Sequence, residues 1–167
     1  MNHRTMRRTG AAALALLVMA LAIVATAGPA AAAEPSKAEA APIQAVVDAF
    51  MEALDTANIE KFSALFAPDA TAFFPLAPLY TRLENKDQIT KVFTVFFESV
   101  RKGKTGPRYM NLVPQGQKIQ LYGDTAVVTF HFEGPDLIAR RTLVLRRVGG
   151  KWLIVHMHAS GLAVPKE

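Results

Sequence analysis

The sequence contains no cysteine among its 167 residues. A chain without thiols forms no disulfide framework, no thiolate metal site and no cysteine nucleophile, and it carries no lipid-modified cysteine. It also lacks a glycine-rich phosphate loop, a nucleophile elbow and an internal repeat, so the common nucleotide-binding and hydrolase signatures are absent. The candidate chemistry must therefore come from a few histidines, acids and arginines.

Basic charge is not concentrated anywhere in the sequence. The formal net charge is +5, and three of the positive charges (Arg4, Arg7 and Arg8) lie at the N-terminus, so 5 − 3 leaves about +2 for the rest. The remaining lysines and arginines are dispersed, whereas a nucleic-acid surface shows a basic stripe. We expect no nucleic-acid partner.

Residues 1–33 have the features of a secretory signal peptide. The arginines precede an apolar stretch from Ala11 to Val24, Gly28-Pro29 interrupts any helix, and the small residues up to Ala33 form a peptidase site. The alternative is a membrane anchor, but the leucine-rich part is shorter than the ~20 residues that span a bilayer. The prediction is cleavage after Ala33 and a secreted or periplasmic protein with no membrane contact.

The mature chain is expected to hold one domain. Residues 34–41 read as a polar spacer with nothing to pack, and residues 42–167 as the domain itself. A domain of roughly 130 residues buries enough surface to fold without a metal or a disulfide. We therefore expect no structural metal and no cofactor.

Three amphipathic helices are predicted in the first part of the domain. One stripe of apolar residues begins after Pro42 and ends at Leu54, a short helix follows the capping residue Asn58, and Pro68-Asp69 ends it. A third helix is expected over residues 86–102, with Asn85 as its cap. Each stripe has the i, i+3, i+4, i+7 spacing of a helix with one buried face.

Strands dominate the second part. A short strand is expected at 71–74, and four longer strands follow at the ranges 109–122, 126–132, 137–147 and 152–160. Glycine-containing turns separate the four, as in antiparallel hairpins. This order predicts an α+β fold with one curved antiparallel sheet and its helices on a single face. Apolar residues at both parities of the late strands indicate that a second subunit covers the other face.

Two segments resemble a known family. They are Thr-Ala-Phe-Phe-Pro-Leu-Ala at 71–77 and Gly-Lys-Trp-Leu-Ile-Val-His-Met-His-Ala-Ser-Gly at 150–161. They resemble the association (hub) domain of calcium/calmodulin-dependent protein kinase II, within the SnoaL-like, nuclear-transport-factor-2-like superfamily, which bacterial proteins share. The resemblance implies a cone with three helices on the concave face of the sheet, a homodimer or larger ring, and a deep pocket.

The resemblance also assigns candidate pocket residues. Where the family has pocket arginines, this chain has Ala159, Leu143 and Glu133. The expected pocket is therefore largely apolar and takes a small apolar ligand. Its candidate contacts are Met157, Ala159 and Leu143, with Glu133, His131 and Arg141 orienting the ligand.

The histidines leave alternatives open. If Ala159 faces the pocket, strand alternation puts Met157 inside and both His156 and His158 outside, unless a bulge reverses this. Outside the pocket, the two histidines are interface or structural residues. With a bulge, they are pocket residues. A metal site is the third alternative, but it lacks an assured third ligand.

Glu133 and His131 are the candidate catalytic residues, because a carboxylate inside an apolar cone could act as a general acid or base. The alternative is a solvated pair at a hairpin end. Two functions follow: an oligomerising small-ligand-binding module, or an isomerase, cyclase or dehydratase that uses Glu133 and a histidine.

Overall fold

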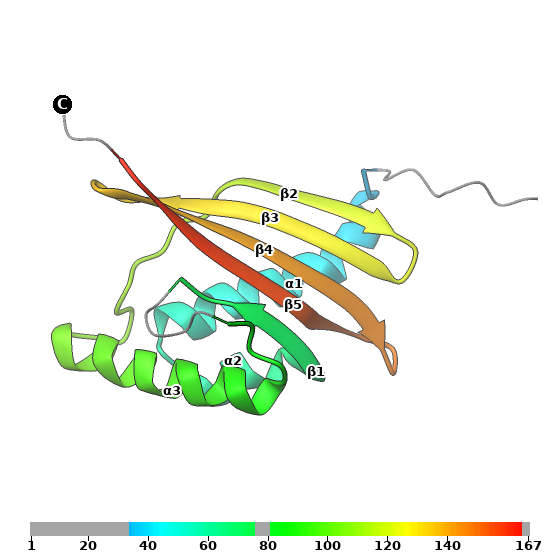
Figure 1. The fold of residues 1–167 in the computed structure, drawn as a ribbon. Coiled ribbons are helices and arrows are strands. Elements are labelled where there is room, and N and C mark those ends of the chain that lie inside the picture. Colours follow the sequence, from blue (N-terminus) through cyan, green and yellow to red (C-terminus); the bar gives the residue numbers. More distant parts are fainter. Residues whose placement is uncertain (1–33, 76–80, 165–167) are drawn as a thin grey trace, which may run out of the picture.

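The computed structural model describes residues 34–75 and 81–164, which form three helices and five strands. The strands make one twisted sheet in the order β1-β5-β4-β3-β2. All three helices lie on the same side of this sheet (Figure 1). The predicted α+β class, with a curved sheet and helices on one face, is confirmed. The predicted leader (1–33) lies outside the described residues and stays a prediction.

The first helix, α1 (Lys37–Asp55), begins five residues earlier than the sequence predicts. Ser36 and Glu39 form a capping box: the Ser36 side chain accepts from the Glu39 backbone, and the Glu39 side chain accepts from the Ser36 backbone. Pro42 therefore lies inside the helix rather than at its start. Most of the expected spacer at 34–41 is helical, and none of it belongs to the buried core.

The second helix is shorter than expected and the first strand is longer. Helix α2 (Ile59–Ala64) begins after Asn58, whose side chain accepts from the Lys61 backbone N–H at 2.9 Å. Strand β1 (Phe66–Phe73) begins five residues before the predicted start at Thr71. At its start Phe66 pairs with Ile154 of β5, and the backbone of Ile154 donates to the carbonyl of the preceding Leu65 at 2.8 Å.

The later elements follow the sequence closely. Helix α3 (Lys86–Gly103) has the predicted cap, Asn85. Strands β2 (Gln115–Tyr122), β3 (Thr125–Glu133), β4 (Leu137–Val148) and β5 (Lys151–Ala163) are joined by short turns. The predicted strand start at Tyr109 is wrong: residues 109–114 form a loop that crosses from α3 to the sheet.

The sheet is mixed rather than purely antiparallel. Strands β2 to β5 form an antiparallel meander, and β1 joins the edge of β5 in parallel. The prediction of an antiparallel sheet is therefore corrected at this edge. The parallel pairing places Thr71 beside His156 and Phe73 beside His158.

The core lies between the helices and the inner face of the sheet. It is rich in phenylalanine, and Phe62 on α2 stacks on Phe93 of α3 with ring centroids 4.2 Å apart. Phe50 of α1 and Phe66 of β1 also pack against Phe62, at 5.5 and 5.0 Å. Such aromatic pairs bury large apolar areas and fix the helices against the sheet.

A bulge in β5 explains most of its two-sided apolar pattern. Leu145 pairs with Ile154 and Val144 pairs with His156, so Val155 is an extra residue in the ladder. The bulge lets Trp152 and Ile154 face the core before it, and Met157 and Ala159 after it. Both parities of this strand thus serve one face.

Among the described helices, none has the length and apolar character needed to cross a membrane.

Candidate functional site

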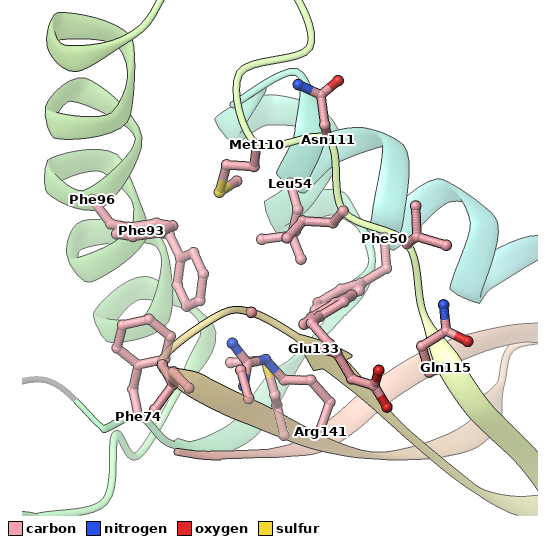
Figure 2. A pocket seen from close by; sticks show the side chains of 17 residues that line it. Phe50, Leu54, Phe74, Phe93, Phe96, Met110, Asn111, Gln115, Glu133 and Arg141 are labelled. Atoms are coloured by element: carbon pink, nitrogen blue, oxygen red, sulfur yellow. The ribbon is translucent and has the colours of Figure 1, made fainter. Parts of the chain in front are cut away.

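A cavity of about 470 Å³ opens between the helices and one end of the sheet. Figure 2 shows its wall: α1 and the 109–114 loop lie on one side, α3 on another, and the sheet forms the floor. The volume falls within the range of ordinary small-molecule sites. The lining residues are Phe50, Leu54, Phe74, Phe93, Phe96, Met110, Asn111, Leu112, Val113, Gln115, Phe132, Glu133, Gly134, Leu137, Ala139, Arg141 and Met157.

Small side chains on the sheet floor leave space for this cavity. Arg141 on β4 has Ala159 of β5 as its cross-strand partner, and the next inward-facing residue of β4 is Ala139, which pairs with Gly161. Toward the other end of the sheet the inward-facing residues are larger, among them Leu143 and Leu145. Their side chains fill the space between the sheet and the helices.

Asp55 holds the loop that forms one wall of the cavity. Asp55 is the one charged residue in the buried core of the described residues, and the residue as a whole is 5% exposed. It accepts from the backbone N–H groups of Met110 (3.2 Å) and Asn111, and from Arg108 Nη1 (3.0 Å). Its own carbonyl accepts from Tyr109 N–H at 2.7 Å. The loop is thereby fixed to the end of α1.

Nothing in the local sequence around Asp55 indicates this role. Asn111 has a positive φ of 50°, which asparagine tolerates better than most residues. An asparagine in a loop, three residues beyond an arginine, is a weak signal by itself. Only the fold brings it to a carboxylate more than fifty residues away.

Of the predicted pocket residues, Arg141, Met157 and Glu133 line the cavity. Leu143 and Ala159 do not. Both are buried on the inner face of the sheet, at 0% and 3% exposure, and pack into the core beside the cavity. The expected contact of Leu143 and Ala159 with a ligand is therefore wrong. Their side chains lie in the core next to the cavity floor.

His131 is not in the cavity, contrary to the expectation. It alternates with the buried Phe130 and Phe132 on β3 and lies on the outer face, opposite Arg140. Its Nε2 is 3.1 Å from Glu133 Oε1, and the two side chains are 34% and 67% exposed. This geometry matches the solvated hairpin pair rather than a buried acid–base pair. Glu133 reaches the cavity only at its edge.

A second hollow, of about 480 Å³, lies on this outer face of the sheet. Outward-facing residues of β3 and β4, among them Thr129, His131, Arg140 and Thr142, line it. The sheet lies between it and the aromatic cavity, and Arg141 contributes to the lining of both.

His156 and His158 lie outside the cavity as well. His156 Nδ1 is 2.8 Å from Thr71 Oγ1, and Phe73 packs near both imidazoles, with ring centroids 6.1 and 5.8 Å away. Burial, followed by the positive charges of His158 and Arg82, lowers the pKa of His156. Within the described residues, no three His, Asp or Glu side chains are placed to hold a metal ion.

The polar lining of the cavity is sparse. Among the described residues that line it, Arg141 is the one cation, Asn111 and Gln115 carry the amides, and Glu133 carries the one carboxylate. Burial lowers the pKa of the Arg141 guanidinium. The fold and site define a class: an α+β cone with helices over one sheet face and an apolar internal pocket with few polar groups.

The comparison with protein families agrees with this class. The model of the SnoaL-like domain matches residues 43–165, so the chain belongs to the SnoaL-like domain family. No curated protein matches the chain significantly.

Solved structures of similar fold come from several bacteria. An NTF2-like protein of unknown function from Pseudomonas putida is 25% identical, with a TM-score of 0.63 over 75% of this chain and 87% of that one. A Xanthomonas campestris protein, provisionally described as a calcium/calmodulin-dependent protein kinase II association domain, is 29% identical, with a TM-score of 0.58 over 81% and 95%. A provisional dehydratase from Streptomyces avermitilis is 19% identical, with a TM-score of 0.62 over 76% and 98%.

The superfamily part of the predicted resemblance is thus confirmed. One of these neighbours carries the association-domain description and others do not.

Proposed function

We propose that this chain is an exported SnoaL-like module that binds a small, largely apolar ligand in its internal cavity. The observation that carries the proposal is the cavity of about 470 Å³, whose wall is mostly aromatic and aliphatic. Transfer of apolar surface from water contributes about 25 cal/mol per Å², which favours an apolar guest. The few polar groups would set its orientation.

The positions of Glu133 and His131 favour binding over catalysis. A general acid or base must reach the reacting atom within hydrogen-bond distance. The imidazole of His131 lies across the sheet from the cavity, and the Glu133 carboxylate is paired with it. No histidine is among the cavity-lining residues in the described part of the chain. An isomerase, cyclase or dehydratase that uses these two groups is therefore the less supported alternative.

Thermal shift with neutral probes tests the binding proposal. Decan-1-ol and 2-naphthylacetamide should raise the unfolding temperature of the mature protein in a concentration-dependent way, because a ligand that binds only the folded state stabilises it. Ala139→Phe should abolish the shift, since Ala139 lines the cavity. Val95→Phe is the matched control, because Val95 is 67% exposed on α3.

Two outcomes contradict the proposal. One is that neither probe shifts the wild-type protein at any concentration up to its solubility. The other is an equal shift for wild type and Ala139→Phe, which would place the guest elsewhere. Glu133→Gln should bind both probes as wild type does. A turnover lost in this variant with binding retained would favour the enzyme alternative.

Self-association through the outer sheet face is part of the same proposal. Phe73 is 41% exposed there beside His156 and His158, and Val127 and Val144 are cross-strand partners on that face. A homodimer would remove these side chains from water. Because the β5 bulge brings Trp152 and Ile154 to the core as well as Met157 and Ala159, the apolar side chain that chiefly supports this interface is Phe73.

A further inference from the structure

Arg141 is a half-buried cation that no carboxylate among the described residues pairs with. We propose that the ligand of the cavity carries a carboxylate, and that this group pairs with the Arg141 guanidinium. The inference rests on the proposed function, because it names the chemical class of the guest in the same cavity. The predicted guest is an apolar acid, with a hydrocarbon chain or ring and one anionic head.

The backbone position of Arg141 directs its side chain to the cavity. On the inner face of the sheet its cross-strand partners are Phe130 on β3 and Ala159 on β5. The preceding residue, Arg140, faces the other way and is exposed. The two adjacent arginines therefore differ in environment, and only Arg141 stands in the apolar cavity, among the sticks at its floor in Figure 2.

The hydrogen-bonding capacity of Arg141 is mostly unused. Its Nη1 donates to the backbone carbonyl of Arg140 at 2.7 Å, and its guanidinium carbon lies 5.5 Å from the centre of the Phe132 ring. A guanidinium has five N–H donors in a planar fork that matches a carboxylate. Most of these donors remain available to a guest.

Two acids at the wall of the cavity, Glu133 and Asp55, are both engaged elsewhere. Glu133 pairs with His131 at 3.1 Å, and Figure 2 shows its carboxylate directed away from the Arg141 guanidinium, toward Gln115. Asp55 is held by Arg108 and by the loop backbone. Across residues 34–75 and 81–164, no ion pair neutralises the Arg141 guanidinium.

Burial makes an unpaired Arg141 guanidinium unfavourable. A charge in an apolar environment is unfavourable unless it is paired, and burial lowers the pKa of the Arg141 guanidinium accordingly. A bound carboxylate would offset that cost and gain a charge-assisted contact in a site of low dielectric. An alcohol or amide of the same shape would gain only neutral hydrogen bonds.

The cavity also orients such a guest. Arg141 lies on the sheet side, whereas Leu54 and Met110 lie across the cavity from it, toward α1 and the loop (Figure 2). The head group would therefore sit on the sheet floor, and the apolar part would extend among the helix side chains. This arrangement differs from the one implied by the kinase association domain, whose arginines correspond to Ala159, Leu143 and Glu133 here.

Matched acid and neutral probes test the inference by titration calorimetry at neutral pH. The pairs are decanoate with decan-1-ol, and 2-naphthylacetate with 2-naphthylacetamide. In each pair the acid should bind the wild type roughly tenfold tighter or more. Arg141→Met should remove that preference and keep neutral binding, Arg141→Lys should keep part of it, and Arg140→Met should behave as wild type.

The outcomes separate this inference from the proposed function. Neutral probes that bind as tightly as their acids, or an acid preference that survives Arg141→Met, would overturn the carboxylate assignment and leave the binding proposal intact. If Arg140→Met lost the acid preference as fully as Arg141→Met, the carboxylate assignment would also be overturned, because the carboxylate would then bind at the outer face of the sheet. Absence of binding by all four probes would overturn both proposals. Circular dichroism of each variant confirms that it is folded.

Discussion

Asp55 and Arg108 form an ion pair of 3.0 Å whose two sides differ sharply in burial. The Asp55 side chain is 7% exposed, whereas that of Arg108 is 74% exposed. The carboxylate also accepts two backbone N–H groups of the loop that walls the cavity, from Met110 and Asn111. The contribution of the Asp55 carboxylate to stability should therefore come from its hydrogen bonds with the buried backbone donors rather than from its ion pair with Arg108.

The first prediction follows from that asymmetry. Asp55→Ala removes the acceptor for two backbone donors, so it should lower the free energy of unfolding by about 2–4 kcal/mol. Arg108→Ala, the control, should cost less than about 1 kcal/mol, because an exposed ion pair contributes little. Urea unfolding of both variants measures the difference. An equal loss in the two would show that the ion pair, not the backbone bonds, carries the stability.

The second prediction concerns export. Intact-mass measurement on the exported protein should give a chain that begins at Glu34, because a peptidase site of small residues ends at Ala33 after Gly28-Pro29. Ala33→Pro should block processing and leave the leader attached. A mature chain that retains residues 11–24 would mean a membrane-anchored protein instead.

Local sequence signals predicted the helices and hairpins of this fold well. Helix α3 could be placed because a capping asparagine, an apolar stripe and a C-terminal glycine agree with one another. The start of α1 was missed because Pro42 looks like a first-turn residue, whereas the capping box at Ser36 and Glu39 lies in a segment of spacer composition. Pro42 is the sixth residue of α1 and gives up one intrahelical hydrogen bond, while the capping box at Ser36 and Glu39 stabilises the turn before it.

The features that position the site depend on contacts distant in sequence. Asp55 meets Arg108 and Asn111 across 53 and 56 residues, and no local pattern reports such a contact. The orientation of His131 was mispredicted through the alignment with a related family, although the alternation of Phe130 and Phe132 with it pointed to the outer face. The bulge at Val155 changes which alternate residues of β5 face the core. No glycine stands at that position, so the sequence does not predict where the change occurs.

The third prediction concerns self-association. Light scattering on the mature protein at micromolar concentration should give at least twice the monomer mass. Phe73→Glu should shift it to the monomer, since a charge would be buried in the interface. Val95→Glu, on an exposed helix position, is the matched control and should leave the mass unchanged. A wild-type protein with only the monomer mass would refute the proposed dimer.

The last prediction is a pH dependence of stability that originates in His156. Burial lowers its pKa, and the positive charges of His158 and Arg82 lower it further. Histidines of an unfolded chain have a pKa of about 6.5, so the unfolded chain binds this proton more readily than the folded state does. Protons therefore favour unfolding. The contribution of neutral His156 is fully present above about pH 6.5 and is lost as the pH falls from there through the lowered pKa of the folded state.

His156→Gln should remove this part of the dependence while it keeps a polar group within reach of Thr71 Oγ1, which lies 2.8 Å from His156 Nδ1 in the wild type. The slope of the unfolding temperature between about pH 7 and pH 5 should therefore be smaller in this variant. His131→Gln is the matched control, because it removes another imidazole of the outer face and leaves His156 in place. If the slope of His156→Gln equals that of wild type, the folded and unfolded states bind this proton equally, and the lowered pKa has no consequence for stability.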